Sequence, residues 1–291
     1  MMNIASSTHK EDILKDLLDT FEEMTSGSSA SLSACIALSR ISISMSRLVS
    51  TCDLEDSIGT VKHYSEKGRK LLKILERKLS TAKTVTTRAR IISAMYHLNH
   101  DAAYTYDDSW EAVCSAAVKS LYDDALSAYA SLSELESAFL CQCIAHTLYL
   151  TADCDGSSEQ MRKYFNDSIS SWMSVDWACD FSPSVVIARL HALVCNSDMF
   201  MDTRYDRQIS IMSDYLCRKM DTLTDSEKMD LYHLVSDKGS PAYSRYYADC
   251  LSSMDYSSVS DNESLYLRID HICRNIEYDM MENYNKSFYE M

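Results

Sequence analysis

Hydrophobic residues recur every three or four positions along most of the chain, which is the spacing that places them on one face of an α-helix. Ile13, Leu17 and Phe21 follow this spacing near the N-terminus. Two segments, 138–150 and 185–194, carry apolar residues at almost every position and leave little room for a polar face. We therefore expect helices throughout the chain, with these two segments in the centre of the fold.

The expected helix starts are marked by capping residues, because the chain has only five Gly and two Pro. Ser131 with Glu134 and Thr224 with Glu227 have the capping-box spacing, and Pro183 follows Ser182 at the first position of a helix. These signals and the apolar spacing predict about twelve helices. The expected ranges are 9–24, 29–50, 54–80, 85–100, 109–130, 132–152, 158–175, 183–196, 204–221, 225–237, 241–253 and 261–288.

One segment also fits a strand. Ile41, Ile43 and Met45 alternate with serines, which is the two-residue period of a half-buried strand. A single strand would leave its backbone groups without partners, since no other segment pairs with it. We therefore expect a helix here.

A series of helices with short links favours antiparallel hairpins, stacked either as an open superhelix or as a closed bundle. One unit resembles a tetratricopeptide repeat. Trp110, Val113 and Cys114 stand where that family has Trp, Leu and Gly, whereas Ala117 replaces its Tyr. The resemblance implies an all-α, tetratricopeptide-like superhelix, and the closed bundle remains the alternative.

The composition is that of a globular protein, because 46% of the residues are hydrophobic. We expect a single domain over 1–291, with a weak subdivision near 101–108. The most apolar stretch, 32–49, contains Arg40 and Arg47, so no membrane span is expected. The first residues lack the features of a secretory signal, and the odd count of eleven Cys favours reduced thiols, so we expect a cytoplasmic protein.

The charge is unevenly distributed. The segment 62–90 carries ten bases and two acids, a net charge of +8, whereas the rest of the chain carries 18 bases and 41 acids. Five of these bases share one helical face by their spacing of three and four, and we call them the basic ridge. The basic ridge comprises Lys62, Arg69, Lys70, Lys73 and Arg77.

The basic ridge fits a protein or peptide partner, an acidic face of a second copy, or a purely solvated surface. A nucleic-acid partner is disfavoured, because the whole-chain charge of −15 repels a polyanion beyond the Debye length of about 8 Å. Tyrosine is abundant at nineteen, and rigid rings with a polar tip are typical of binding surfaces. We place a candidate binding surface at Tyr243, Tyr246 and Tyr247.

Several metal-ligating and nucleophilic residues lie close together in the sequence. His97 and His100 are three residues apart on one expected helix, and Asp101 adds an oxygen ligand. This set resembles the His-Asp core of helical metal-dependent phosphohydrolases. By contrast, His146 and His191 lie on strongly apolar helices and are interpreted as hydrogen-bonded core residues.

A second set of possible metal ligands is acidic. Asp107, Asp108 and Glu111 resemble the aspartate-rich motif of class I terpene synthases, an all-helical family that binds magnesium diphosphate through carboxylates. Both resemblances imply an enzyme that acts on phosphate or diphosphate esters. They form our alternative hypothesis.

Known loop and catalytic motifs are missing from the sequence. It contains no phosphate-binding glycine loop, G-x-S-x-G, H-E-x-x-H or C-x-x-C. Our leading hypothesis is therefore a non-catalytic helical-repeat protein that binds a protein or peptide partner and needs no cofactor.

Overall fold

The structure is a computed structural model that describes most of the central part of the chain. The described segments are 61–100, 108–127, 131–150, 156–200 and 205–224. Single described residues are 12, 15, 16, 19, 32, 35, 36, 38, 39, 41–43, 45, 227, 228, 230, 231 and 234. At 61–65, 100, 147–150, 156–158 and 196–200 the description covers the backbone alone.

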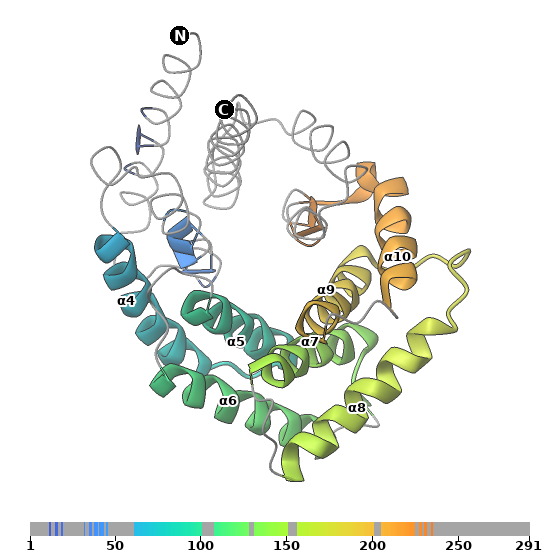
Figure 1. Ribbon diagram of the computed structural model, residues 1–291, viewed down its shortest axis with the longest axis horizontal. Helices are drawn as coiled ribbons and strands as arrows, with labels where there is room; N and C mark the ends of the chain where they lie inside the picture. The colour runs from blue at the N-terminus through green and yellow to red at the C-terminus, as the bar shows by residue number, and fades with distance from the viewer. Residues whose placement is uncertain are drawn as a thin grey trace, which may run out of the picture. The chain divides into compact units, whose positions relative to one another are not determined.

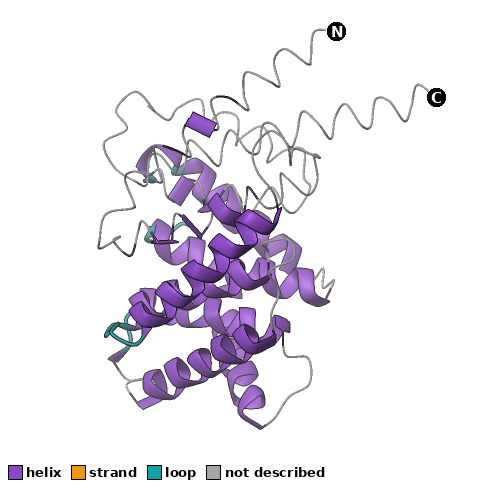
Figure 2. Ribbon diagram, turned by 90° about the vertical axis from the view of Figure 1, so that its left-hand side faces the viewer, coloured by secondary structure: helices purple, strands orange, loops and turns teal. Residues whose placement is uncertain are grey.

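Helices account for nearly all of this part of the chain, as Figures 1 and 2 show. Within the described segments there is no strand, which confirms the all-α prediction. None of these helices is both long and apolar enough to cross a lipid bilayer. The helices are α4 (Val61–Leu79), α5 (Val85–His100), α6 (Asp108–Ser127), α7 (Glu134–Leu150), α8 (Gly156–Met173), α9 (Pro183–Phe200), α10 (Asp206–Arg218) and the 3₁₀-helix η3 (Met220–Thr222).

The chain divides into two compact units. The first comprises Met1–Ser80, Ala94–Trp110 and Asp255–Met291, and the second comprises Thr81–Ser93 and Glu111–Met254. Helix α5 is continuous and contributes residues to both units. The second unit contains α7, α8, α9 and α10.

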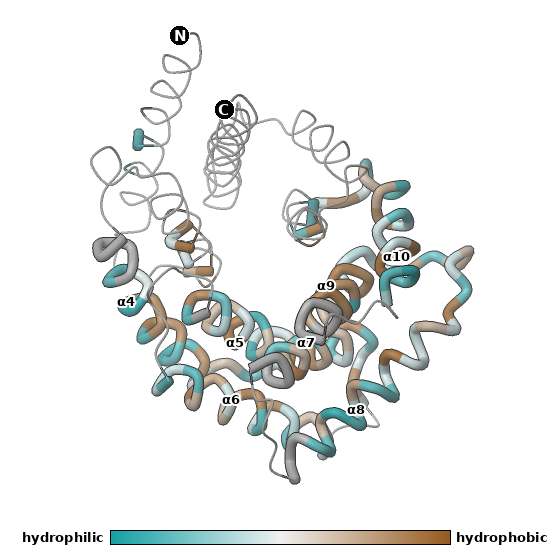
Figure 3. Tube along the Cα trace, viewed as in Figure 1, coloured by the Kyte–Doolittle hydropathy of each residue, from teal (hydrophilic) through white to brown (hydrophobic). Residues whose placement is uncertain are grey.

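The two segments without a polar face form the core of the second unit, as predicted. Helix α9 packs against α7 and α10, and α7 also packs against α8. Figure 3 shows α9 in hydrophobic colours along the part that is described. Ala138 of α7 lies in one cluster with Val185 and Ala188 of α9, and Leu190 is completely buried. Burial of apolar surface between these helices supplies the main driving force for folding of the unit.

A capping box begins α7, but it is not the predicted one. Ser133 donates a 2.8 Å hydrogen bond from Oγ to Oε2 of Glu136, and its own Oγ accepts one from the Glu136 backbone N–H at 3.2 Å. Ser131 and Glu134 have the same spacing, but Glu134 binds Arg189 instead. The predicted pair was therefore wrong by two residues, whereas the pair of Thr224 and Glu227 is confirmed.

The described residues of the strand-like segment are helical. Ile41, Ser42 and Ile43 all lie in α-helical backbone and are buried. The hydroxyl of Ser42 donates a 2.8 Å hydrogen bond to the carbonyl oxygen of Leu38, four residues earlier. Because the polar atom is satisfied within its own helix, the serine can be buried without a further partner.

Helix α10 ends earlier than predicted. It stops at Arg218 rather than at residue 221, and Lys219 has φ −104° and ψ 15°. The Lys219 backbone N–H donates to the carbonyl of Leu216 at 2.9 Å, a tighter bond than the α-helical one. The chain then continues as η3. The predicted helix was too long because apolar spacing does not distinguish an α-helical turn from a 3₁₀ turn.

One charged residue is buried against the core. Arg189 of α9 lies 4.7 Å above the ring centre of Trp172 and binds the Glu134 carboxylate at 2.5 Å. Its Nε atom has no hydrogen-bond partner. Burial lowers the pKa of Arg189, although the nearby carboxylate acts in the opposite direction.

Candidate functional site

The basic ridge lies on the exposed face of α4. Arg69, Lys70, Lys73 and Arg77 are all exposed, and they occupy successive turns of the helix. The opposite face buries Leu71, Leu72 and Leu75, so the helix is sharply divided into a basic face and an apolar face. The side chain of Lys62 lies outside the described residues.

The ridge cations are not paired with acidic residues in the described part of the chain. Among the residues of known position, none of Arg69, Lys70, Lys73 and Arg77 forms an ion pair. Ile74, on the same helix, keeps 37% of its surface exposed beside them. The predicted tyrosines 243, 246 and 247 lie outside the described residues.

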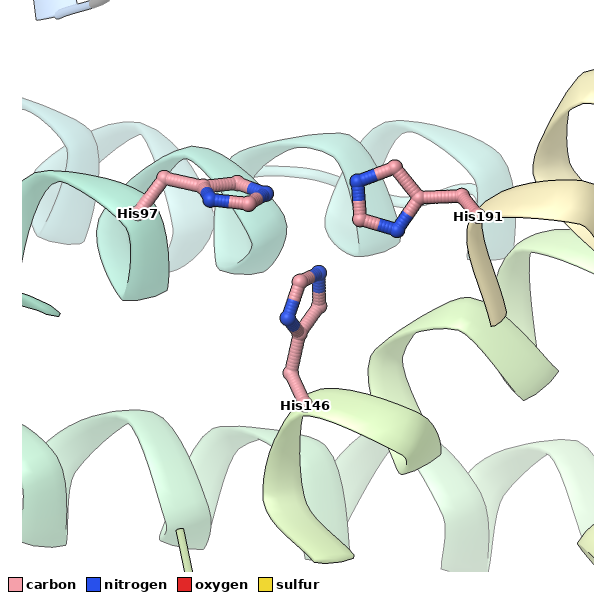
Figure 4. Close-up of side chains that lie close together, drawn as sticks. All are labelled: His97, His146 and His191. Carbon is pink, nitrogen blue, oxygen red and sulfur yellow. The ribbon is translucent and has the colours of Figure 1, made fainter. Parts of the chain in front are cut away.

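Two histidines of the second unit lie close together. His146 is on α7 and His191 on α9, and Figure 4 draws both rings. One ligand nitrogen of His146 lies within 4.8 Å of one of His191. The rings of His146 and His191 meet edge to face, with centres 5.0 Å apart. His146 is buried, whereas His97 and His191 are half-buried.

The ring of His146 is held by a polar chain. Its Nε2 atom lies 3.3 Å from Oγ of Ser93, and Nε2 of Gln142 donates to the same Oγ at 3.4 Å. Ser93 lies on α5, one helical turn before His97. The prediction that His146 is a hydrogen-bonded core residue is therefore confirmed.

A thiol adjoins two of the imidazoles. Sγ of Cys195 lies 3.5 Å from Nδ1 of His191 and 3.9 Å from Nδ1 of His146. Cys195 and His191 are four residues apart on α9, and this spacing places both side chains on one face of the helix. Cys195 is half-buried. The site thus offers nitrogen and sulfur ligands, the types that zinc prefers.

The ligand sets predicted from the sequence are only partly described. His100 ends α5 and its side chain is not described, and Asp101 and Asp107 lie outside the described residues. Asp108 is exposed at the start of α6, and Glu111 is half-buried. The phosphate-ester hypothesis stays a prediction.

Two other thiols are core residues, as predicted. Cys141 and Cys143 of α7 are buried, and the Cys143 thiol donates to the carbonyl of Ala89 at 3.3 Å. Burial raises the pKa of Cys141 to about 12, and burial also raises the pKa of Cys143. Neither thiol is a nucleophile near neutral pH, because the thiolate is the reactive form.

Sequence reasoning missed the association of His146 with His191. The two histidines are 45 residues apart, which is far outside any short motif.

The chain was also compared with known proteins. No family model, curated protein or solved structure matches it.

Proposed function

We propose that the protein is a non-catalytic, tetratricopeptide-like stack of helical hairpins that binds an acidic segment of another protein. The packing of α7 on α8, of α9 on α10 and of α7 on α9 supports stacked hairpins, because first helices of successive hairpins are then neighbours. The observation that carries the binding role is the exposed row of four cations on α4.

The partner is inferred from the charge and geometry of this face. Four cations on one helical face favour a partner that carries several carboxylates in a row, because each ion pair adds attraction without burying a charge. Ile74 offers a small apolar contact at the edge of the face. An acidic peptide with one hydrophobic side chain matches both features. Association should be fast and strongly dependent on salt, because the charges lie on the surface.

A quadruple variant tests this proposal. Replacement of Arg69, Lys70, Lys73 and Arg77 by Gln removes the charge from the ridge, and should change the free energy of unfolding little because all four are exposed. Partners that co-purify with the wild-type chain at low salt should be lost. They would be identified by mass spectrometry after crosslinking from a photoreactive residue at position 73.

A matched control is available on other helices. The exposed cations Lys119, Lys163, Arg207 and Arg218 lie on α6, α8 and α10, and their replacement by Gln gives the same change in net charge. This control should keep the partner. If both variants lose it equally, net charge rather than the α4 face is responsible and the proposal is wrong. Crosslinks to a partner segment without acidic residues would also contradict it.

A further inference from the structure

A thiol and two imidazoles meet where α7 packs on α9. Sγ of Cys195 lies 3.5 Å from Nδ1 of His191 and 3.9 Å from Nδ1 of His146. All three residues belong to the second compact unit. We propose that His146, His191 and Cys195 bind one zinc ion, with water as its fourth ligand. This site is independent of the basic ridge on α4 and goes beyond the proposed partner binding.

The packing of α7 on α9 determines where the three side chains lie. Ala138 of α7 lies in one cluster with Ala188 of α9. His146 follows Ala138 by eight residues, which is about two helical turns. Cys195 follows Ala188 by seven residues, and His191 lies one turn before Cys195. The two helix faces that form this part of the core therefore also bring the three ligands together.

The distances to sulfur are those of a tetrahedral zinc site. Zinc–nitrogen bonds of about 2.0–2.1 Å and zinc–sulfur bonds of about 2.3 Å place sulfur about 3.6 Å from each nitrogen. The observed distances of 3.5 and 3.9 Å are close to this value. The rings of His146 and His191 have centres 5.0 Å apart, and Figure 4 shows them pointing toward one another. Rotation of the half-buried His191 ring can complete the geometry.

A zinc ion would use both imidazole contacts of Cys195 at the same time. A thiol has one proton and is a weak donor, so its hydrogen bond serves one of the two Nδ1 atoms at a time. Zinc binds the thiolate and both nitrogens together, and the proton of the thiol passes to solvent. Imidazole nitrogen and thiolate sulfur suit zinc, whereas magnesium and calcium require oxygen ligands.

The polar chain at Ser93 prepares His146 for this role, and it lies within the same unit. When Nε2–H of the ring donates to Oγ of Ser93, Nδ1 is left unprotonated and faces the Cys195 thiol. Gln142 donates to the same Ser93 oxygen. Metal-binding histidines commonly donate the second ring nitrogen to a neighbouring acceptor, which fixes the tautomer and the orientation of the ring.

The fourth position of the ion is left for solvent. Zinc sites with three protein ligands keep the remaining tetrahedral position for water. His191 and Cys195 are half-buried rather than buried, so solvent reaches this side of the group. A bound zinc would connect α7 to α9 and stabilise the second unit in proportion to its affinity.

The experiment is a zinc titration of the purified full-length protein in a reducing buffer, after removal of metal with a chelator. Isothermal titration calorimetry and elemental analysis should find stoichiometric zinc in the wild type, and magnesium should not replace it. Partners of metal ligands alone contribute about 10–100-fold to metal affinity, so Ser93→Ala should lower the zinc affinity about tenfold. His191→Gln and Cys195→Ser each remove a ligand and should lower it about 100-fold or more.

Cys179→Ser is the matched control for the loss of a thiol. Cys179 is exposed and precedes α9, whereas Cys195 lies twelve residues after the first residue of α9, about 18 Å along the helix. The control variant removes one thiol from the same unit and should bind zinc as the wild type does.

Cobalt(II) substitution tests the sulfur ligand directly. The cobalt form should absorb in the near ultraviolet through sulfur-to-cobalt charge transfer. Cys195→Ser should abolish this band, and Cys179→Ser should keep it. Circular dichroism of each metal-free variant checks that it is folded, so a loss of binding through unfolding is recognised. The proposal is overturned by a wild type without stoichiometric zinc, by full zinc affinity in both folded ligand variants, or by a wild-type cobalt form without the sulfur band.

Discussion

Replacement of Leu190 by Ala gives a quantitative test of the core between α7, α9 and α10. The side chain of Leu190 is completely buried in α9. The change removes three carbon atoms, and each buried carbon contributes about 0.8 kcal/mol, so the lost transfer free energy is about 2.4 kcal/mol. A residual cavity of roughly 50 Å³ adds about 1.2 kcal/mol at 24 cal/mol per Å³. We expect a decrease of about 3–4 kcal/mol in the free energy of unfolding.

The measurement is urea denaturation followed by far-ultraviolet circular dichroism. A decrease of this size should also lower the melting temperature by about 6–16 °C. Leu126→Ala on α6 is the matched control, because it makes the same change in a helix of the same unit at a side chain that is 41% exposed. The control should change the free energy of unfolding by less than about 1 kcal/mol. If the two variants are destabilised equally, Leu190 is not in the core, and the packing described above for α9 is incorrect.

Three further predictions concern charged and reactive groups. Arg189→Met removes a buried charge and its unpaired Nε, so the free energy of unfolding should stay within about 1 kcal/mol of wild type or increase; a loss above about 2 kcal/mol, measured in urea, would contradict this. The hydrogen bonds from Ser133 lower the pKa of Glu136 below its ordinary value of 4.5. The stability from this bonded carboxylate should be present above that value and should disappear as the pH falls through the lowered pKa. The free energy of unfolding of Ser133→Ala should be about 1 kcal/mol lower than that of wild type at neutral pH, and this difference should become smaller in acid. A difference that does not change with pH would refute the assignment. Brief alkylation of the native protein, mapped by peptide mass spectrometry, should modify exposed Cys179 and spare Cys141, whose pKa is raised to about 12 by burial. Equal labelling of both would contradict the buried position of Cys141.

Local patterns predicted the helices well because the information lies within a few neighbouring residues. The range 85–100 was predicted for α5 and is observed, and α9 begins at Pro183 as expected. The start of α7 was missed, because two Ser-x-x-Glu pairs overlap and a distant residue, Arg189, engages the first Glu. Such competition depends on tertiary contacts, so local spacing cannot resolve it.

The same reasoning explains what could be predicted of the candidate sites. The exposure of Arg69, Lys70 and Lys73 follows from the amphipathic period of one helix, and it is observed. The pairing of His146 with His191 depends on which turns of two separate helices become neighbours. Nothing within any one helix records that register, so the histidines could be noted singly and their association could not be predicted.

Buried serines allow helices of this protein to pack closely although serine is a polar residue. Ser39, Ser42 and Ser213 are almost wholly inaccessible, and each hydroxyl binds a carbonyl four residues earlier. The volume of such a serine is little more than that of alanine, and its hydroxyl is already hydrogen-bonded within its own helix. It can therefore pack against a neighbouring helix much as alanine does. Hydropathy scales therefore underestimate how much of this sequence can serve as close-contact surface. Replacement of these serines by alanine should change the free energy of unfolding little, whereas the bulkier valine should force the adjoining helices apart.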